Sequence, residues 1–552
     1  MRCKSPRNGK AEQRAEPRAE QRRRAPDRCP LSEVGGSICA VDTTPLSAIE
    51  AAVGGAGDEP TPAARLAALN SISPAMIDDV VFGADAARLG AAADGRVVAI
   101  GVAASPGVGV GRVAVDPVAA LDSWEAGRDV VLVVDETTPA DEPAMRVASA
   151  IVTRRGSLAS HAAIIARQYG IPAVCGVGEI EARAGEQWLV DGATGEVRHL
   201  DDDSASQAGR GGPALSELPT AVKTLLAWAD EVAAGGLVVM ANADDENAVR
   251  TALSLGASGV GLCRTEHQFL GEAAGVVARL LAGDHEALAE FAQHQRAALR
   301  GVFSAAEDRP ITVRLLDAPS HEFGGATEHN PMLGVRGIRL GLMRPEILEA
   351  QAVAAAEAWC DVAEPSSAGR SAAPRVRLCL GVVAFPEEVA AARSIIDGAV
   401  ERVGSVRGRR IDMAASAMVE TPRAALCTAM FATEVDSICF GTNDLTQLTY
   451  GLSRDDSAEL VAEYRRRGIL ERDPFATLDH LGVARLLALA AQTATAANPE
   501  IALSMCGEHA ADPASIAIAA QLGITTLSVS PYRVPATRLA AARCIIEGDG
   551  RR

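Results

Sequence analysis

After Leu218, the chain alternates between short apolar runs of β type and longer stretches with helical periodicity. Eight such runs recur, and between most of them apolar residues are spaced three or four positions apart, as on one face of a helix. The runs are Leu237–Asn242, Gly259–Cys263, Ile311–Leu316, Val376–Val383, Ala417–Val419, Ser437–Phe440, Ile501–Met505 and Thr525–Val529. Strands that alternate with helices in this way predict an α/β fold, a (β/α)8 barrel of the TIM type over residues 218–546. An open doubly wound sheet is the alternative.

The stretch before this region has a different pattern, in which β-type runs are short and separated by Gly and Pro. The runs are Val97–Val102, Val110–Val115, Val130–Val134, Ala148–Val152 and Gln187–Val190. The Gly-rich segment 105–111 lacks the Lys-Ser/Thr ending of a nucleotide-binding P-loop, so we interpret it as a structural turn. We expect a compact β/α domain over residues 96–200.

Three further segments complete the predicted domain organisation. Residues 1–34 are basic and poor in apolar residues, which predicts a disordered tail. Residues 35–95 are Ala-rich and predict a small helical connector. Residues 201–217 are acidic and then rich in Gly, Ser and Pro, which is the composition of a flexible linker.

A histidine at a predicted helix start is the first candidate for chemistry. The apolar run that ends at Val152 breaks at Gly156, and a helical pattern begins at His161 with Ser160 as the predicted N-cap. Backbone N–H groups and the helix dipole at such a position favour an anion. The imidazole could therefore carry a phosphoryl group, although a polar residue that merely begins a helix is the alternative.

Reactive side chains follow the predicted barrel strands, where TIM barrels carry their active sites. They are Arg264, Arg314, Glu420, residues 441–444 and Cys506. Arginines suit bidentate capture of phosphate or carboxylate, and Glu420 and Asp444 offer the hard oxygen ligands that Mg²⁺ prefers. Cys506 could serve as a proton donor or a nucleophile. This pattern predicts a Mg²⁺ site for a small phosphorylated acid.

Charge and cysteine usage exclude several other classes of protein. The net charge of −18 argues against general nucleic-acid binding. No apolar stretch is long enough for a membrane span, and no secretory signal is visible. The eleven cysteines are scattered without metal-type spacing, which favours a reduced, cytoplasmic chain.

Six long motifs, together with the histidine segment, make the chain resemble the phosphoenolpyruvate (PEP)-utilising enzymes, and among them the pyruvate, phosphate dikinases. The motifs are GASGVGLCRTEHQF (256–269), VRLLDAPSHEF (313–323), NPMLGVRGIRL (330–340), FGTNDLTQLTYGLSRDD (440–456), CGEHAADPAS (506–515) and SPYRVPATRLAAA (530–542). The resemblance covers about residues 96–546. It implies a mobile phosphohistidine domain followed by a PEP-binding TIM barrel.

The resemblance also implies a role for each matching position. His161 would be phosphorylated at its Nε2 (tele) atom, and Cys506 would protonate the methylene carbon of enolpyruvate. The implied substrate-binding residues are Arg264, Arg314, Arg336, Glu420, Gly441, Thr442, Asn443 and Asp444. Glu420 and Asp444 are also the implied Mg²⁺ ligands. The implied activity is Mg²⁺-dependent phosphoryl transfer between PEP and His161 with formation of pyruvate, by a homodimer that associates through the barrel.

Several departures from the family pattern matter. We expect no ATP-grasp nucleotide domain in this chain, so that the ATP half-reaction would need another chain, either an ATP-grasp or a phosphoacceptor protein. A regulatory Thr of the family is Ala159 here, a family Ser is Cys439, and a family Tyr is Thr526. The last two leave the tuning of Cys506 open.

Two other functions compete with this one. The first is a PEP–protein phosphotransferase that resembles enzyme I of the sugar phosphotransferase system. The uninterrupted run from Arg96 to His199 leaves no room for the helical insertion of that family. The second is a non-catalytic binding or regulatory homologue, and the presence of every core catalytic position argues against it.

Overall fold

The computed structural model describes most of the chain from Thr44 onward. The described residues are 44–57, 59–81, 95–137, 141–156, 160, 162–163, 165–166, 170–201, 218–269, 273–317, 319, 328–363, 374–454 and 457–549. The predicted tail 1–34, His161 and nearly all of the predicted linker 201–217 lie outside them. No helix within these ranges is both long enough and apolar enough to cross a membrane.

Eight parallel strands form a closed barrel in the second half of the chain. They are β9 (Val238–Asn242), β10 (Val260–Arg264), β11 (Pro310–Arg314), β12 (Arg375–Leu380), β13 (Met413–Val419), β14 (Ser437–Gly441), β15 (Ala502–Cys506) and β16 (Thr526–Val529). Each strand pairs with the next, and β16 pairs with β9 to complete the circle. This confirms the predicted α/β barrel and excludes the open sheet.

The barrel interior is filled by side chains from five of these strands. Leu262, Cys379, Met418, Cys439 and Cys506 form one buried cluster. Because β10 and β12 are not neighbours, their side chains can meet only across the inside of the barrel. The apolar strand residues that point outward join a larger core with the surrounding helices. Burial on both faces explains why the strands read as continuous apolar runs.

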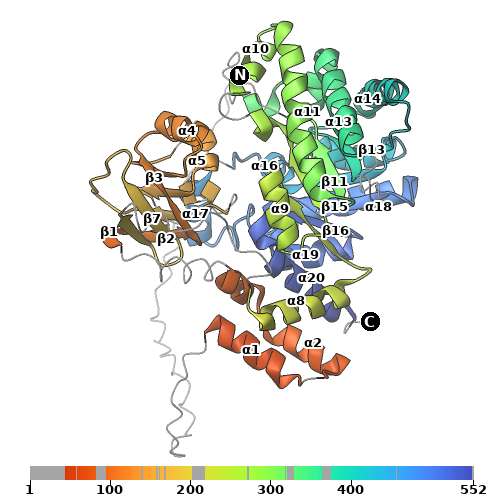
Figure 1. Ribbon diagram of the computed structural model, residues 1–552. Helices are drawn as coiled ribbons and strands as arrows, with labels where there is room; N and C mark the ends of the chain where they lie inside the picture. The colour runs from red at the N-terminus through yellow and green to blue at the C-terminus, as the bar shows by residue number, and fades with distance from the viewer. Residues whose placement is uncertain are drawn as a thin grey trace, which may run out of the picture. The chain divides into compact units, whose positions relative to one another are not determined.

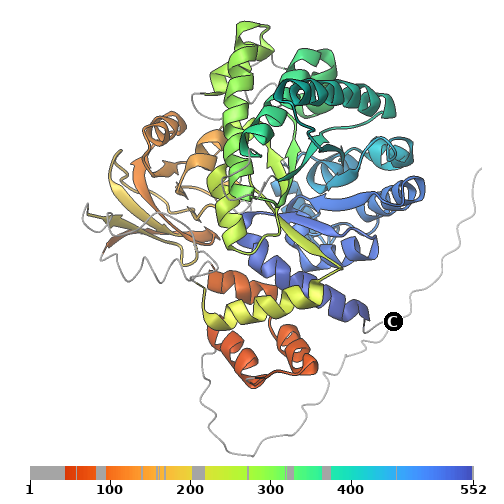
Figure 2. The same cartoon turned by 45° about the vertical axis from the view of Figure 1, so that its right-hand side comes forward.

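Helices surround the barrel (Figures 1 and 2). They are α9 (Glu246–Ser254), α10 (Ala274–Leu281), α11 (Glu286–Ala306), α12 (Gly337–Met343), α13 (Pro345–Val362), α14 (Pro386–Arg407), α15 (Pro422–Cys427), α16 (Thr442–Tyr450), α18 (Val483–Ala497), α19 (Pro513–Gln521) and α20 (Val534–Asp549). A further short helix, α17 (Ala458–Arg466), lies in the connection between α16 and α18. Several begin at a side-chain cap, as α9 does at Asp245, whose carboxylate accepts from Ala248 N.

The described helices of the predicted connector pack against helices that flank the barrel strands. Helices α1 (Pro45–Gly55) and α2 (Pro62–Ser71) share an apolar core with α8 (Thr220–Ala233) and α20. An ion pair between Arg533 and Asp78 ties this region to the segment after β16.

Residues 96–200 form a separate eight-stranded sheet in the order β1-β8-β7-β3-β4-β5-β6-β2. Its strands are β1 (Arg96–Ile100), β2 (Val102–Ser105), β3 (Val108–Ala114), β4 (Val130–Val134), β5 (Ala150–Thr153), β6 (Ala173–Cys175), β7 (Gln187–Asp191) and β8 (Glu196–Leu200). Helices α4 (Pro117–Glu125) and α5 (Glu142–Val147) contribute to an apolar core on one face. The domain boundaries predicted around this sheet stay a prediction.

Only part of the Gly-rich segment 105–111 is the turn that we expected. Pro106 and Gly107 connect β2 to β3, with φ of 118° at Gly107, whereas residues 108–111 lie in β3. A Cβ on Gly109 would lie 2.0 Å from the carbonyl oxygen of Ser149, and one on Gly111 would lie 2.7 Å from the backbone of Asp129. These two glycines therefore allow close approach of the neighbouring chain.

Candidate active site

The carboxyl ends of the barrel strands gather the residues that the sequence pattern singled out. Because all eight strands run parallel, these ends share one rim of the barrel. Arg264 ends β10, Arg314 ends β11, Gly441 ends β14 and Cys506 ends β15, while Glu420 directly follows β13. The register sets Arg264 beside Arg314 and Gly441 beside Cys506 on neighbouring strands. The fold thus brings together residues that are far apart in the sequence.

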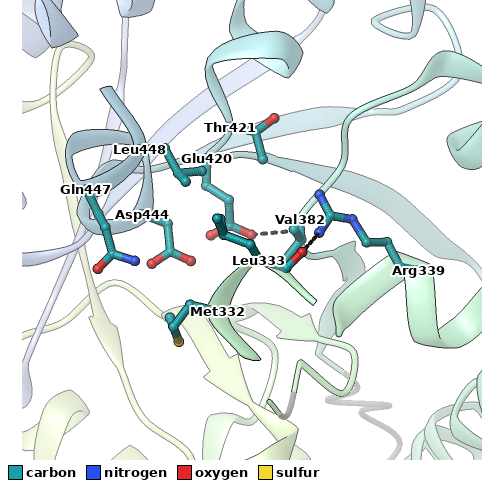
Figure 3. A pocket seen from close by; sticks show the side chains of 9 residues that line it. All are labelled: Met332, Leu333, Arg339, Val382, Glu420, Thr421, Asp444, Gln447 and Leu448. Carbon is teal, nitrogen blue, oxygen red and sulfur yellow. Dashed lines mark hydrogen bonds between the residues drawn. The ribbon is translucent and has the colours of Figure 1, made fainter. Parts of the chain in front are cut away.

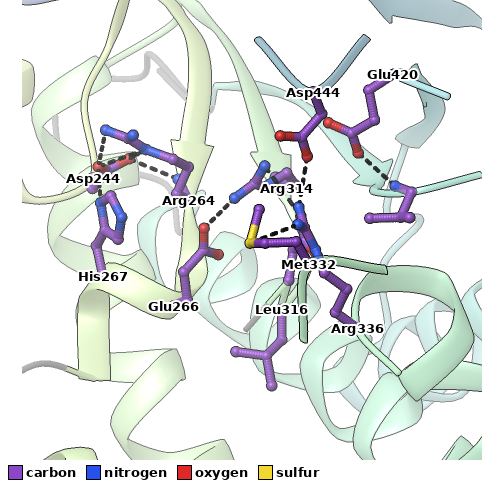
Figure 4. A network of polar contacts seen from close by, with 12 residues as sticks. Asp244, Arg264, Glu266, His267, Arg314, Leu316, Met332, Arg336, Glu420 and Asp444 are labelled. Carbon is purple, nitrogen blue, oxygen red and sulfur yellow. Dashed lines mark hydrogen bonds and ion pairs between the residues drawn. The ribbon is translucent and has the colours of Figure 1, made fainter. Parts of the chain in front are cut away.

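Two arginines and three carboxylates form a continuous series of ion pairs on this rim. Figure 4 shows two of these pairs, Arg314 with Glu266 and Arg336 with Asp444. Arg314 pairs with Glu266 through Nη2, and its Nη1 lies 3.3 Å from Asp317 Oδ2. Arg336 donates from Nε to Asp317 Oδ1 over 2.7 Å, and from Nη2 to Asp444 Oδ2 over 2.8 Å. The predicted arginines are therefore held in place by acidic partners.

One donor in this series is left over. The Nε atom of Arg314 is buried and has no hydrogen-bond partner among the described residues. A buried polar group without a partner costs about 1–3 kcal/mol. An anionic oxygen bound at this position would remove that cost.

Arg264 is held by a residue that the sequence analysis did not single out. Asp244, just beyond β9, accepts from Arg264 Nε over 3.1 Å and from Nη2 over 2.9 Å. The same carboxylate accepts from His267 Nδ1 over 2.6 Å. The signal for Asp244 was weaker in the sequence, since Ala243 separates it from the end of the first barrel strand.

Glu420 lies in a pocket beside Asp444 (Figure 3). The pocket is lined by Met332, Leu333, Arg339, Val382, Glu420, Thr421, Asp444, Gln447 and Leu448. Burial, together with the nearby carboxylates of Asp444 and Asp317, raises the pKa of Glu420 to about 8. Glu420 Oε1 accepts from the backbone N of Val382 over 2.6 Å. Val382 has φ of 56°, an unfavourable conformation for a β-branched residue, and it directs its N–H toward Glu420.

The donor set of this pocket fits Mg²⁺. Glu420 and Asp444 line the same pocket, and carboxylates are the hard oxygen ligands that match magnesium. Within the described ranges, no group of three or more His, Cys, Asp or Glu side chains is arranged to hold a metal. Glu420 and Asp444 alone would therefore leave coordination positions for substrate oxygens and water, as is usual for Mg²⁺ in phosphoryl-transfer sites.

A glycine makes room for this carboxylate. A Cβ on Gly441 would lie 2.6 Å from Glu420 Oε2, closer than side-chain atoms approach one another. The backbone at Gly441 is not in the left-handed region, so the requirement for glycine is steric.

The loop 441–443 is tied to the end of β15. The buried hydroxyl of Thr442 donates to the carbonyl oxygen of Cys506 over 2.9 Å and lies 2.8 Å from His509 Nδ1. Asn443 Oδ1 accepts from Glu508 N over 3.1 Å. These bonds fix the position of the loop relative to the thiol.

The thiol of Cys506 lies beside a second thiol. The Sγ atoms of Cys439 and Cys506 are 3.3 Å apart, and Cys506 Sγ lies 3.6 Å from the carbonyl oxygen of Phe440. The hydrogen bond with Cys439 and burial together raise the pKa of Cys506 well above its usual range. The proton therefore stays on Cys506, as a proton donor requires. Cys439 thus touches the predicted acid directly.

His161 lies outside the described residues, but a few of its neighbours in the sequence lie within them. Ser160 Oγ accepts from Ala163 N over 3.5 Å, in the manner of the predicted N-cap. Gly156 has φ of 125°, a conformation that favours glycine, where we expected the chain to break.

Comparison with known proteins relates this arrangement to one family. The model described as PEP-utilising enzyme, PEP-binding domain, matches residues 217–545, and the model described as PEP-utilising enzyme, mobile domain, matches residues 126–195. The first of these covers more than half of the chain.

Curated relatives agree with the family models. The chain is 37% identical over 500 residues to the chloroplastic pyruvate, phosphate dikinase of Mesembryanthemum crystallinum, covering 82% of this chain and 51% of that protein. It is 37% identical over 489 residues to the pyruvate, phosphate dikinase of Rhizobium meliloti (strain 1021), covering 82% and 54%. The chain spans about half the length of the curated relatives it matches. It belongs to the PEP-utilising enzyme family, and it resembles the C-terminal part of pyruvate, phosphate dikinase.

Proposed function

We propose that this chain transfers a phosphoryl group between phosphoenolpyruvate and His161, with pyruvate as the partner product or substrate. One observation carries the proposal. Arginines, a pair of carboxylates and a protonated thiol meet on the rim of a barrel that matches the PEP-binding domain. Each of these groups suits one part of the reaction.

The arginines suit the anionic groups of phosphoenolpyruvate. Arg264 and Arg314 are neighbours on β10 and β11, so both can reach one phosphate group. Arg336 is fixed between Asp317 and Asp444, close to the carboxylate pair. Charge on the transferring phosphoryl group is stabilised best by donors that are already oriented, as these are.

Glu420 and Asp444 would hold Mg²⁺, which supplies Lewis-acid stabilisation of the negative charge on substrate oxygens. Gly441 leaves space beside Glu420, and the N–H of Val382 orients its other oxygen. Thr442 and Asn443 keep the adjoining loop in place.

Cys506 completes the reaction on the carbon side. When the P–O bond of phosphoenolpyruvate breaks, the phosphoryl group moves to Nε2 of His161 and the enolate of pyruvate remains. The Cys506 thiol then gives its proton to the methylene carbon, which yields pyruvate and a thiolate that regains a proton from solvent. In the reverse direction, the thiolate removes a methyl proton from pyruvate.

Phosphoenolpyruvate labelled in its phosphate group tests the proposal. Purified protein with Mg²⁺ should acquire acid-labile, base-stable label on His161 and form one pyruvate for each phosphoryl group bound. The His161→Ala variant should acquire no label. Absence of label on the unaltered protein would overturn the proposal.

The same labelled protein identifies the phosphoryl acceptor. Loss of label to AMP and pyrophosphate, with formation of ATP, would indicate a complete dikinase reaction. Label that stays until a separate ATP-grasp or phosphoacceptor protein is added would place the second half-reaction on another chain, which is the outcome we propose.

A further inference from the structure

Asp244 makes several hydrogen bonds to Arg264 and His267, which lie at and just after the end of the neighbouring barrel strand. Its Oδ2 accepts from both Nε and Nη2 of Arg264, and its Oδ1 accepts from the backbone N of Arg264 over 2.7 Å. Oδ2 also accepts from His267 Nδ1. One carboxylate therefore holds the main chain and the side chain of Arg264 together with a histidine three positions further on (Figure 4).

The charge state of this cluster is well defined. Burial alone would raise the pKa of Asp244. Arg264 and His267 nevertheless hold that pKa well below its usual range, so the carboxylate is ionised. Burial and the positive charge of Arg264 lower the pKa of His267 to about 4. The imidazole is therefore neutral near neutral pH, and its Nδ1 must carry the proton that it shares with Asp244.

The geometry of the Asp244 contacts fixes the orientation of Arg264. A carboxylate that engages Nε and Nη2 sets the plane of the guanidinium, and the bond to the backbone N sets where the side chain begins. Arg264, Asp244 and His267 have side chains that are 17%, 15% and 10% exposed, so water competes little for these bonds.

Asp244 also stands apart from the carboxylates that hold the other two arginines. Arg314 and Arg336 share Asp317 and form one connected series with Glu266 and Asp444. A change at Asp244 therefore acts on Arg264 first and leaves the bonds within that series in place.

We propose that Asp244, with His267 behind it, is a positioning residue that sets the affinity for phosphoenolpyruvate by orienting Arg264 toward the phosphate group. The inference rests on the proposed function, because it needs Arg264 to bind that phosphate. Nothing in it requires Asp244 to touch the substrate.

Two measurements on Asp244→Ala and Asp244→Asn test this. The first is the phosphoenolpyruvate concentration that gives half-maximal labelling of His161. The second is exchange of pyruvate methyl protons with solvent in the absence of phosphate, which depends on Cys506, Glu420 and Asp444 rather than on Arg264. We expect the half-saturating concentration to rise roughly 10- to 100-fold, the size of effect that a displaced binding group produces. The extent of labelling at saturating phosphoenolpyruvate and the methyl exchange should stay within about twofold of the unaltered protein, because His161, Cys506 and the carboxylate pair are not displaced.

Asp230→Ala is a matched control. Asp230 Oδ1 accepts from Arg538 Nε over 2.9 Å, and its Oδ2 accepts from Arg538 Nη2 over 2.5 Å, so this aspartate engages the same two guanidinium nitrogens between α8 and α20. This change removes an Asp–Arg ion pair without altering the rim, so the half-saturating concentration should not change. Asp244→Glu keeps the charge and should recover part of the affinity.

The outcomes separate the two proposals. Loss of methyl exchange together with labelling would show that Asp244 is merely structural and overturn the inference, as would an unchanged half-saturating concentration. If Asp244→Ala does not fold, Asp244→Asn decides, since it is nearly isosteric and keeps one acceptor oxygen. Failure of the unaltered protein to acquire label would instead overturn the proposed function itself, before any variant is compared.

Discussion

Cys439 and Cys506 lie on the adjacent strands β14 and β15 with their sulfur atoms 3.3 Å apart. Both are buried, and the pKa of Cys506 is raised by the hydrogen bond with Cys439 and by burial. Because the thiol form is favoured, Cys506 can give up a proton only to a base as strong as an enolate. Cys439 is therefore the residue placed to tune the protonation of Cys506, the proposed acid.

Cys506→Ala should separate the two halves of the proposed reaction. We expect exchange of pyruvate methyl protons to fall by about 10²- to 10⁴-fold, the usual contribution of a general acid or base. Labelling of His161 by phosphoenolpyruvate should persist, since phosphoryl transfer precedes protonation. Deuterium incorporation into pyruvate and acid-labile label measure the two steps. Loss of both in this variant would show that Cys506 is not simply the acid.

Cys439→Ala should weaken the same step by a smaller amount. Removal of the neighbouring thiol leaves Cys506 with the carbonyl of Phe440 as a polar contact at 3.6 Å. We expect methyl exchange to fall about tenfold. Cys439→Ser replaces the thiol with a hydroxyl, which can still form the hydrogen bond, so its exchange rate should stay close to that of the unaltered protein. Cys360→Ala, a buried cysteine on α13, is the control and should leave exchange unchanged. Equal rates in Cys439→Ala and Cys360→Ala would argue against any tuning by Cys439.

His161→Ala should have the opposite effect to Cys506→Ala. The variant has no phosphoryl acceptor, so no label should be bound. Slow methyl exchange of pyruvate should remain, because Glu420, Asp444 and Cys506 are all on the barrel. The same deuterium assay checks this, and complete loss of exchange would count against separate sites.

Glu420 should make the metal-free protein less stable as the pH rises. Its pKa of about 8 in the folded state lies above the ordinary value of 4.5, so the folded protein binds this proton more tightly than the unfolded chain. The contribution to stability is fully present below pH 4.5 and is lost as the pH rises to about 8, at most about 5 kcal/mol.

Thermal unfolding with a chelator between pH 5 and 9 measures this effect. Glu420→Gln should reduce the fall in stability between about pH 5 and pH 8, because the variant has no carboxyl group to ionise there. Mg²⁺ at pH 8 should restore stability to the unaltered protein only. A variant profile parallel to that of the unaltered protein would show that Glu420 is ionised throughout.

Gly441→Ala should disturb the carboxylate pair. Its Cβ would meet Glu420 Oε2 at 2.6 Å and Glu420 Cβ at 2.8 Å, so the glutamate must move. We expect a loss of about 1–3 kcal/mol in stability, as for other overpacked sites, and a weaker response to Mg²⁺ in the labelling assay. Gly275→Ala on α10 is the control, because a Cβ there meets nothing within 4 Å. Equal stability of the two variants would mean that the pocket adapts.

The barrel was predictable because its strands are buried on both faces and therefore read as apolar runs. The run Ala417–Val419 marked only the end of β13, since Met413, Ala414, Ala415 and Ser416 are mostly small residues without β character. The Gly-rich segment was partly misinterpreted for a related reason. Glycine in a turn and glycine that admits a neighbouring chain look alike in sequence.

The residues at the strand ends were also predictable, but their partners were not. Strand ends indicate which residues share a rim. The ion pairs between Asp244 and Arg264, or between Asp317 and Arg336, depend on side-chain orientation in space. Asp244 was missed because it follows the first strand of the barrel after one intervening residue, Ala243, rather than at the strand end itself.

The ion pairs on the rim have a consequence for how tightly a substrate is held. Three arginines face five carboxylates, namely Asp244, Glu266, Asp317, Glu420 and Asp444. An incoming anion meets cations whose charges are already matched, so its binding is an exchange of counter-ions. Replacing a carboxylate partner of an arginine yields less net affinity for the anion than binding to an unpaired arginine would. If the proposed function holds, a phosphate ester bound at this rim would therefore also be released readily, as a reversible reaction requires.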